Sequence, residues 1–369
     1  MMNDIMSVGF YAIIGIFCII AANRAKYTPR LSFWFIVIVL TLLAGLRHQS
    51  VGIDTTPYVN LLSPLREGFS WRQNNINEPG FLFLSYILVN ISKGYTLMLI
   101  AFAFIINFFT VKRLFDLRND ISFPWAIFIF FMQYYFTTFN TMRQWIAMAI
   151  LFYFSKHIGN GTKGILKFII AVCVATLFHK TAIIMIVLVP LFLLLRKSGT
   201  RWHQIIKATM LILAPVALAV LLIYMQSHYG NTYGNISTTQ NISFVAIFRL
   251  VFFLLLILLS ALGIDHSESY GGAVSNDAGL IRIKDKERFE TTITVLGATF
   301  TLLVFFFTYA DRLATYFMMF EMIVLPRYIK KSRFRMMVIV FVLVLFTYLR
   351  MMSFKANGFG EVPYLFFWE

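Results

Sequence analysis

Apolar runs recur along this chain from its first residues to its last, and many of them are about as long as a helix that crosses a lipid bilayer. Hydrophobic residues make up 59% of the chain, and charged residues only 13%. A soluble protein of 369 residues could not hide so much apolar surface in one core. We therefore predict an all-α, polytopic integral membrane protein, with residues 1–369 forming a single membrane domain.

The basic residues predict how the chain is threaded through the membrane. Lysine and arginine outnumber aspartate and glutamate by 32 to 16, and basic clusters are typical of cytoplasmic loops. With these clusters inside, the apolar runs give about twelve crossings, among them 123–139 and 205–224, with both ends of the chain outside. The run at 81–91 is too short to span comfortably, so we predict a re-entrant or interfacial helix there.

Three polar stretches follow from this threading. Residues 47–80 and 226–243 are predicted to be extracytoplasmic loops, and residues 264–290 a cytoplasmic loop. The stretch 226–243 contains no lysine or arginine, which is the best single argument for the orientation. Topology alone then explains the excess of positive charge, so no nucleic acid partner is predicted.

The basic residues on the predicted outer side need another explanation. Arg143 and Arg312 lie near the starts of helices that run inward, His179 occupies a similar turn, and Arg47 opens the first outer loop. A cation at a helix N-terminus is unfavourable by roughly 0.3–1 kcal/mol. A bound anion reverses that sign, because free N–H groups and a guanidinium together suit a phosphate. An anionic ligand at the lipid boundary is the prediction, and snorkelling of each arginine to lipid headgroups is the alternative.

Local features refine this outer face. Asn140 or Thr141 is predicted to cap the helix that carries Arg143, and Arg249 is a weaker candidate for the anion site. The outer carboxylates are scattered, so no metal site is predicted. The sequence contains no P-loop and no G-x-G-x-x-G, which argues against ATP-driven transport.

Six motifs occur in a fixed order: R-x3-VG-x-DT-x2-Y at 47–58, EPGF at 78–81, FNTMRQ-x2-AMA at 139–149, LFHKTAI at 177–183, DRLATYF at 311–317 and PY at 363–364. Together they resemble the EpsG family of Wzy-type bacterial polysaccharide polymerases, over nearly the whole chain. The family usually has threonine where this chain has Ile53, a departure that removes one hydroxyl.

The resemblance implies a GT-C-like glycosyltransferase that joins oligosaccharide repeat units carried on undecaprenyl diphosphate, at the outer face of the bacterial inner membrane. The growing chain leaves its lipid diphosphate and is transferred to the non-reducing end of a new lipid-linked unit. No cofactor, nucleotide sugar or metal is expected, because the lipid diphosphate is the leaving group. Besides the lipid-linked oligosaccharide and membrane lipid, the expected partners are a flippase and a chain-length-regulating co-polymerase.

Under this hypothesis the candidate residues take three kinds of role. The diphosphate is bound by Arg47, Arg143 and Arg312. His179 is the first choice of catalytic base, because an unperturbed imidazole titrates near neutrality. Asp54 is the second choice, although it could instead orient Arg47. Three residues are expected to hold sugar or fix the loop: Tyr58, Glu78 and Gln144.

Two other functions remain open at this stage. A transporter such as a lipid-linked oligosaccharide flippase would need polar groups near the membrane midplane and commonly shows repeat-related halves. The sequence shows little of either feature. A ligase that transfers finished glycan to a lipid core would use similar outer-face arginines, and sequence separates it poorly from a polymerase.

Overall fold

The computed structural model describes residues 3–70, 76–196, 244–261, 277–305 and 310–369. Throughout these residues the regular secondary structure is helical, apart from isolated bridge residues, which include the pair Arg47 and Phe366. The predicted all-α class is therefore confirmed for the described part of the chain. The chain divides into two compact units. Unit 1 consists of Met1–Ile184, Leu325–Lys330 and Arg335–Glu369, and unit 2 of Met185–Val324 and Lys331–Phe334.

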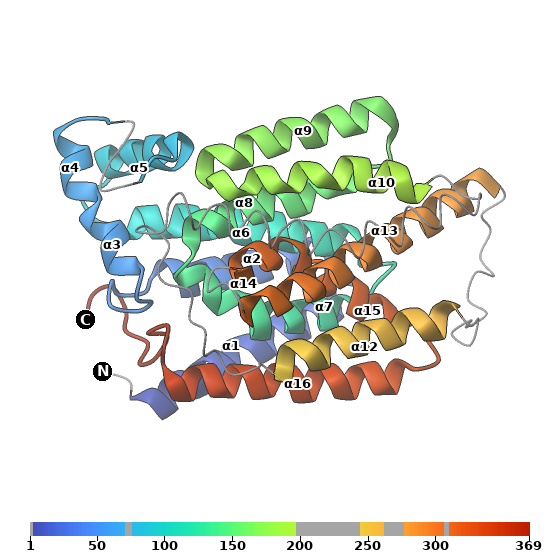
Figure 1. Ribbon diagram of the computed structural model, residues 1–369. Helices are drawn as coiled ribbons and strands as arrows, with labels where there is room; N and C mark the ends of the chain where they lie inside the picture. The colour runs from blue at the N-terminus through green and yellow to red at the C-terminus, as the bar shows by residue number, and fades with distance from the viewer. Residues whose placement is uncertain (1–2, 71–75, 197–243, 262–276, 306–309) are drawn as a thin grey trace. The chain divides into compact units, whose positions relative to one another are not determined.

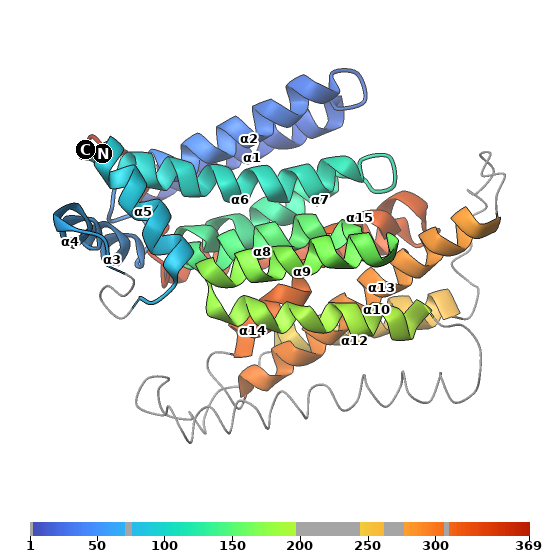
Figure 2. The same cartoon turned by 90° about the horizontal axis from the view of Figure 1, so that it is seen from above.

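Unit 1 is a bundle in which helices that follow one another in the chain tend to pack as neighbours (Figures 1 and 2). Its packing runs in series from α1 to α2, α6, α8 and α9, with the short helix α5 against the end of α9. Its α-helices are α1 (Asp4–Arg24), α2 (Pro29–Gly45), α3 (Thr55–Asn60), α4 (Leu62–Glu67), α5 (Pro79–Ile91), α6 (Thr96–Asp116), α7 (Phe123–Ile129), α8 (Met142–Phe154), α9 (Gly161–Phe178) and α16 (Arg335–Ala356).

Unit 2 is built around the long helix α13. Phe289 of α13 packs edge-on against Phe192, with ring centroids 5.1 Å apart, and Phe300 packs likewise against Phe317 at 5.0 Å. Its described helices are α10 (Leu188–Arg196), α12 (Phe244–Ala261), α13 (Asp277–Thr301), α14 (Ala310–Met318) and the start of α15 (Glu321–Lys331). Residues 277–290 of the predicted loop 264–290 thus belong to helix α13, in which Phe289 is buried and Glu287 pairs with Lys331 at 2.8 Å. The predicted crossing at 205–224 and the loop 226–243 lie outside the described residues.

Within the described residues, four helices are long and apolar enough to cross a membrane: α1, α6, α9 and α16. Shorter apolar helices include α2 and α5, and the apolar stretches Lys180–Leu195 and Ile247–Leu256. The total of about twelve crossings therefore stays a prediction. The short helix expected at 81–91 is present as the 13-residue α5, and its re-entrant or interfacial placement also stays a prediction.

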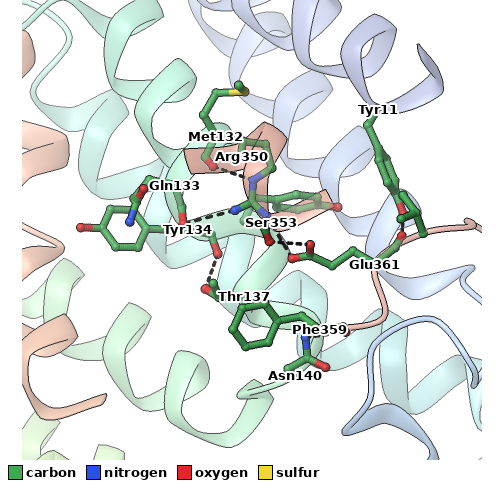
Figure 3. Close-up of polar contacts among 12 residues, drawn as sticks. Tyr11, Met132, Gln133, Tyr134, Thr137, Asn140, Arg350, Ser353, Phe359 and Glu361 are labelled. Carbon is green, nitrogen blue, oxygen red and sulfur yellow. Dashed lines mark hydrogen bonds and ion pairs between the residues drawn. The ribbon is translucent and has the colours of Figure 1, made fainter. Parts of the chain in front are cut away.

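The apolar run at 123–139, predicted as one crossing, is an interrupted helix. Helix α7 passes into a π-helical turn, η1 (Phe130–Tyr134), and then into the 3₁₀-helix η2 (Tyr135–Phe139). Such a change of winding leaves backbone carbonyls without their usual helical donors. Arg350 of α16 supplies donors, with Nε 2.8 Å from the Met132 carbonyl and Nη2 3.4 Å from the Gln133 carbonyl (Figure 3). Hydrogen bonds from Arg350 thus stabilise the interruption of the helix.

The charge of Arg350 is balanced by a buried carboxylate from the C-terminal tail. Arg350 Nη1 lies 3.0 Å from Glu361 Oε1, and the hydroxyl of Ser353 donates to Glu361 Oε2 at 3.0 Å (Figure 3). The Glu361 carbonyl accepts a further bond of 2.7 Å from the hydroxyl of Tyr11. This network fixes the C-terminal tail to α1, to α16 and to the interrupted helix. The interrupted helix is the element that directly precedes α8 in the chain.

The C-terminal tail also holds the loop that follows α2. His48 N donates to the Leu365 carbonyl at 2.8 Å, and Gly52 N donates to the Gly360 carbonyl at 2.7 Å. Tyr364 donates through its hydroxyl to the Leu43 carbonyl at 3.0 Å. The beginning of α1 lies at the same end of unit 1 (Figure 2), since Tyr364 N donates to Ser7 Oγ at 2.8 Å. Hydrogen bonds to the C-terminal tail therefore hold in place the loop that carries the VGIDT motif at 51–55.

Candidate active site

The start of α5 and the end of α9 approach each other closely in unit 1. Pro79 occupies the first position of α5, where its fixed φ fits and no N–H is needed. A Cβ on Gly80 would lie 2.9 Å from the Cβ and 3.2 Å from the carbonyl oxygen of Leu177. Only glycine therefore fits at this contact, which brings Glu78, just before α5, towards His179, the C-cap of α9.

Three predicted site residues meet at this contact, and Glu78 is at their centre. Its Oε2 lies 2.5 Å from Nη1 of Arg143, in the first turn of α8, and its Oε1 lies 3.4 Å from Nδ1 of His179. The Glu78 side chain is 7% exposed, whereas Arg143 and His179 keep 24% and 20%. We call Glu78, Arg143 and His179 the Glu78 cluster. Its basic members are open to a ligand, while its carboxylate is covered.

Glu78 is ionised at neutral pH despite its burial. Burial alone would raise the pKa of Glu78, but the polar contact with His179 and the charge of Arg143 outweigh it and lower the pKa below its ordinary value of 4.5. Aromatic rings complete the surroundings of Arg143, with its guanidinium carbon 5.8 Å from the ring centroid of Tyr58 and 5.9 Å from that of Phe81. These rings orient the guanidinium by cation–π attraction.

The Glu78 cluster has hydrogen-bonding capacity that the described residues do not use. Arg143 Nε is buried without a hydrogen-bond partner. The 3.4 Å between His179 Nδ1 and Glu78 Oε1 is longer than a normal hydrogen bond, and Nδ1 is buried without a hydrogen-bond partner among the described residues. If Nδ1 carries its proton towards Glu78, then Nε2 is the basic nitrogen, because a carboxylate on one side of an imidazole fixes its tautomer.

Arg47 lies in a different environment from the one predicted. It is 1% exposed, and it donates to the carbonyls of Val51 at 3.2 Å, Phe139 at 3.2 Å and Ala44. Its guanidinium carbon also lies 4.6 Å from the centroid of the Phe139 ring. Burial lowers the pKa of Arg47 to about 10, which leaves it charged at neutral pH. The protein itself uses these donors, which argues against direct contact between Arg47 and a ligand.

The VGIDT loop is fixed by contacts to the residues before α8. Gly52 has φ +88°, a conformation that suits glycine, and a Cβ there would lie 2.9 Å from Thr55 Oγ1. Asn140 accepts a bond of 3.2 Å from Asp54 N and donates one of 3.1 Å to the Phe359 carbonyl. Of the two predicted caps of α8, Thr141 does occupy the N-cap position, but it makes no side-chain cap bond. Asn140 instead joins the loop to the C-terminal tail.

The other predicted residues fall into two groups. In unit 1, Tyr58 is buried beside Arg143, Gln144 is buried next to it in α8, and Asp54 is half-buried at the start of α3. The roles of Gln144 and Asp54 stay predictions. In unit 2, Arg312 is exposed in the first turn of α14, and its membership of the site also stays a prediction. Arg249, the weaker candidate, is buried and bonds both oxygens of Glu321 at 2.7 Å.

Sequence reasoning missed the central place of Glu78 and the Arg350–Glu361 pair. Glu78 was predicted only to hold sugar or fix the loop, although a carboxylate directly before Pro-Gly at a helix start was a visible signal. No signal in the sequence links Arg350 to Glu361, because both are isolated charges on the predicted outer side. Among the described residues, no group of three or more His, Cys, Asp or Glu side chains could hold a metal ion.

The helical fold with its membrane-length helices and the polar cluster at helix ends define a membrane protein with a candidate site for an anionic ligand. Comparison with known families gives a more specific result: the EpsG family matches residues 30–366. The chain belongs to the EpsG family, which is of the Wzy-like polysaccharide polymerase type. Its apolar helices and its family make it a membrane protein of polysaccharide biosynthesis. No curated protein and no solved structure matches it.

Proposed function

We propose that this protein polymerises oligosaccharide repeat units carried on undecaprenyl diphosphate. The observation that supports this most is the Glu78 cluster, which combines a partly exposed arginine, a partly exposed histidine and a buried carboxylate in a member of a polymerase family. The donor is the growing chain on its lipid diphosphate, and the acceptor is a hydroxyl at the non-reducing end of a new lipid-linked unit. The enzyme is a glycosyltransferase.

Arg143 acts on the leaving group. As the bond between the anomeric carbon and the diphosphate oxygen breaks, the electron pair stays on the diphosphate and its negative charge grows. Arg143 stabilises that charge through its partly exposed side chain, while Nη1 stays on Glu78. The position of Arg143 in the first turn of α8 adds the positive end of a helix dipole.

His179 acts on the acceptor. Its Nε2 takes the proton of the attacking hydroxyl while the new glycosidic bond forms, and Glu78 stabilises the resulting imidazolium from the Nδ1 side. Glu78 therefore serves both residues, orienting the base and holding the guanidinium. The proton lost by the acceptor and the diphosphate that leaves balance the transfer of the glycosyl group.

Arg47 is a positioning residue in this mechanism. It connects the end of α2, through Ala44, with Phe139 before α8 and with Thr55 one turn before Tyr58. Arg312 is retained as a proposed second ligand of the diphosphate. The predicted threading of basic clusters supports a site on the outer face of the bacterial inner membrane, with a flippase and a chain-length-regulating co-polymerase as partners.

Deletion of the gene, followed by gel analysis of the surface glycan, tests the function. Loss of long chains, with single repeat units still attached, is the expected result. Loss of all glycan would instead indicate a flippase or a ligase and would overturn the proposal. Complementation with Arg143→Ala and with His179→Ala then tests the site, and neither variant should restore long chains.

Two exposed basic residues provide matched controls for these variants. Lys180→Ala changes the neighbour of His179, and Arg66→Ala changes an exposed arginine of α4. Both controls should restore long chains, with all four proteins present in the membrane at similar levels. Normal chain length with Arg143→Ala and His179→Ala would remove the Glu78 cluster from the mechanism, whatever the deletion shows.

A further inference from the structure

A cavity of about 320 Å³ lies within unit 1, at the helix ends far from the Glu78 cluster. The end of α1, the start of α2, the turn between α6 and α7, and residues of α15 form its wall. Helix α2 starts at Pro29 in this wall and ends at Gly45, close to Arg47, and its 17 residues span roughly 25 Å. The cavity is therefore separate from the candidate active site by about the length of a helix.

Three cations line the cavity, and none of its described lining residues is an aspartate or a glutamate. They are Lys26 after α1, Arg118 after α6 and Lys330 in α15. Asp120 is close in sequence but does not line the cavity. Asp116, at the end of α6, is already bound by Lys112 and by Lys156, the latter at 2.8 Å. The described lining residues thus carry three positive charges and no negative one.

The arrangement of these cations suits an anion with several oxygens. Arg118 lies with its guanidinium carbon 4.2 Å from the centroid of the Phe115 ring, and its Nη1 donates to the Phe115 carbonyl at 3.0 Å. This holds the planar fork in one orientation and leaves Nε and Nη2 without a partner among the described residues. Lys330 Nζ is held 2.5 Å from the Asn119 carbonyl, and Lys26 forms no ion pair among the described residues.

We infer that this cavity binds a phosphate group. A fixed guanidinium fork with two ammonium groups matches the tetrahedral oxygens of phosphate, and Ser122 and Asn119 add neutral donors to the wall. Two sources share this chemistry, the headgroup of an anionic phospholipid and a soluble phosphate or diphosphate. The buried apolar residues Ala22 and Ile121 in the same wall suit the start of the acyl chains of a lipid.

The competing explanation is that these residues only follow the positive-inside rule. In that case any basic residue on the same predicted side of the membrane contributes equally to the binding of phosphate or of an anionic lipid. Lys163 provides the comparison, because it is exposed in the first turn of α9, lies on the same predicted side and does not line the cavity. If the cavity binds phosphate, substitution of its basic residues should weaken phosphate binding, whereas substitution of Lys163 should not.

The test is native mass spectrometry of the purified full chain in detergent with added phosphatidylglycerol. We expect the Arg118→Gln/Lys330→Gln double variant to bind one phosphatidylglycerol about tenfold more weakly than the unaltered protein, and Lys163→Gln to bind as the unaltered protein does. In the second arm, inorganic phosphate and diphosphate are titrated against chloride of equal ionic strength, and the melting temperature is followed. If phosphate or diphosphate raises the melting temperature of the unaltered protein but not that of the double variant, the site binds a soluble phosphate.

The outcomes that overturn the inference are equally definite. Binding of neither probe to the unaltered protein would do so, as would unchanged binding by the double variant or an equal loss in Lys163→Gln. If the double variant does not fold, Lys26→Gln replaces it, because the Lys26 side chain is exposed and forms no ion pair among the described residues. It should weaken phosphatidylglycerol or phosphate binding measurably, and unchanged binding by it would count against the site.

Discussion

Arg47 and Arg143 carry the same side chain in two regions that the protein treats in opposite ways. Arg47, after α2, is 1% exposed and donates to three backbone carbonyls and to Thr55 Oγ1. Arg143, at the start of α8, keeps 24% of its side chain exposed, pairs with Glu78 and has a buried Nε without a partner. An arginine whose donors are used by the protein stabilises the fold, whereas one with spare donors at an accessible position can bind a ligand.

The two regions also differ in how firmly they are held. The loop at 47–55 is fixed by the C-terminal tail, by Asn140 and by a glycine with positive φ. The Glu78 cluster has a longer Nδ1 contact at His179 and open side chains. A rigid support beneath a site with unused hydrogen-bonding groups is the arrangement that precise ligand positioning requires.

The largest expected effect is that of Arg47→Ala on stability. The variant leaves the carbonyls of Ala44, Val51 and Phe139 buried without their donor and opens a cavity, which together should cost about 3–5 kcal/mol. The melting temperature of the protein in detergent measures this loss. Arg66→Ala, which removes an exposed arginine, should change the melting temperature little. A stable Arg47→Ala protein that has lost only activity would show that Arg47 contacts the ligand after all.

Arg143→Ala should produce the opposite result, a loss of activity with the fold retained. Removal of one group that stabilises developing charge lowers a rate by about 10²–10³-fold. Glu78 can take up a proton when its partner is gone, so the melting temperature should fall less than in Arg47→Ala. The rate of chain growth in isolated membranes and the melting temperature are measured side by side. Equal loss of stability in both variants would erase the distinction between the two regions.

The sequence supplied the residues of the site better than their roles. The ordered motifs pointed to Arg143, His179, Glu78 and Tyr58, and the structure brings these four side chains together. The burial of Arg47 could not be predicted in the same way, because its acceptors are backbone carbonyls. Their positions depend on how the chain turns after α2, and no pattern of side chains reports that.

The interrupted helix at 123–139 shows a second limit. Its composition is apolar throughout, so hydropathy predicts a single crossing and cannot distinguish α from π or 3₁₀ winding. The donors that make the interruption tolerable come from Arg350, more than two hundred positions along the chain. Contacts of such long range depend on tertiary packing, which a single sequence does not show.

Glu78→Gln should have a smaller effect than Arg143→Ala. The amide keeps the shape of the side chain but loses the charge that orients His179 and holds Arg143, and such supporting contacts are typically worth about 10–100-fold. The measurement is the rate of chain growth in a double-mutant cycle with His179→Ala. If Glu78 acts through His179, the cost of Glu78→Gln should shrink in the His179→Ala background. If Glu78→Gln lowers the rate equally in the unaltered protein and in His179→Ala, Glu78 acts through Arg143 and not through His179.

The smallest expected effect concerns stability at acid pH, and it tests the charge of Glu78 directly. The pKa of Glu78 in the folded protein lies below its ordinary value of 4.5, because contacts to His179 and Arg143 outweigh the effect of burial. A depressed pKa contributes stability that is fully present above the ordinary value and is lost as the pH falls through the folded value. The difference in melting temperature between the unaltered protein and Glu78→Gln should therefore be constant above about pH 5.5 and should shrink below pH 4.5. A difference that grows as the pH falls would mean that Glu78 is protonated in the folded protein, and the electrostatic account of the cluster would then fail.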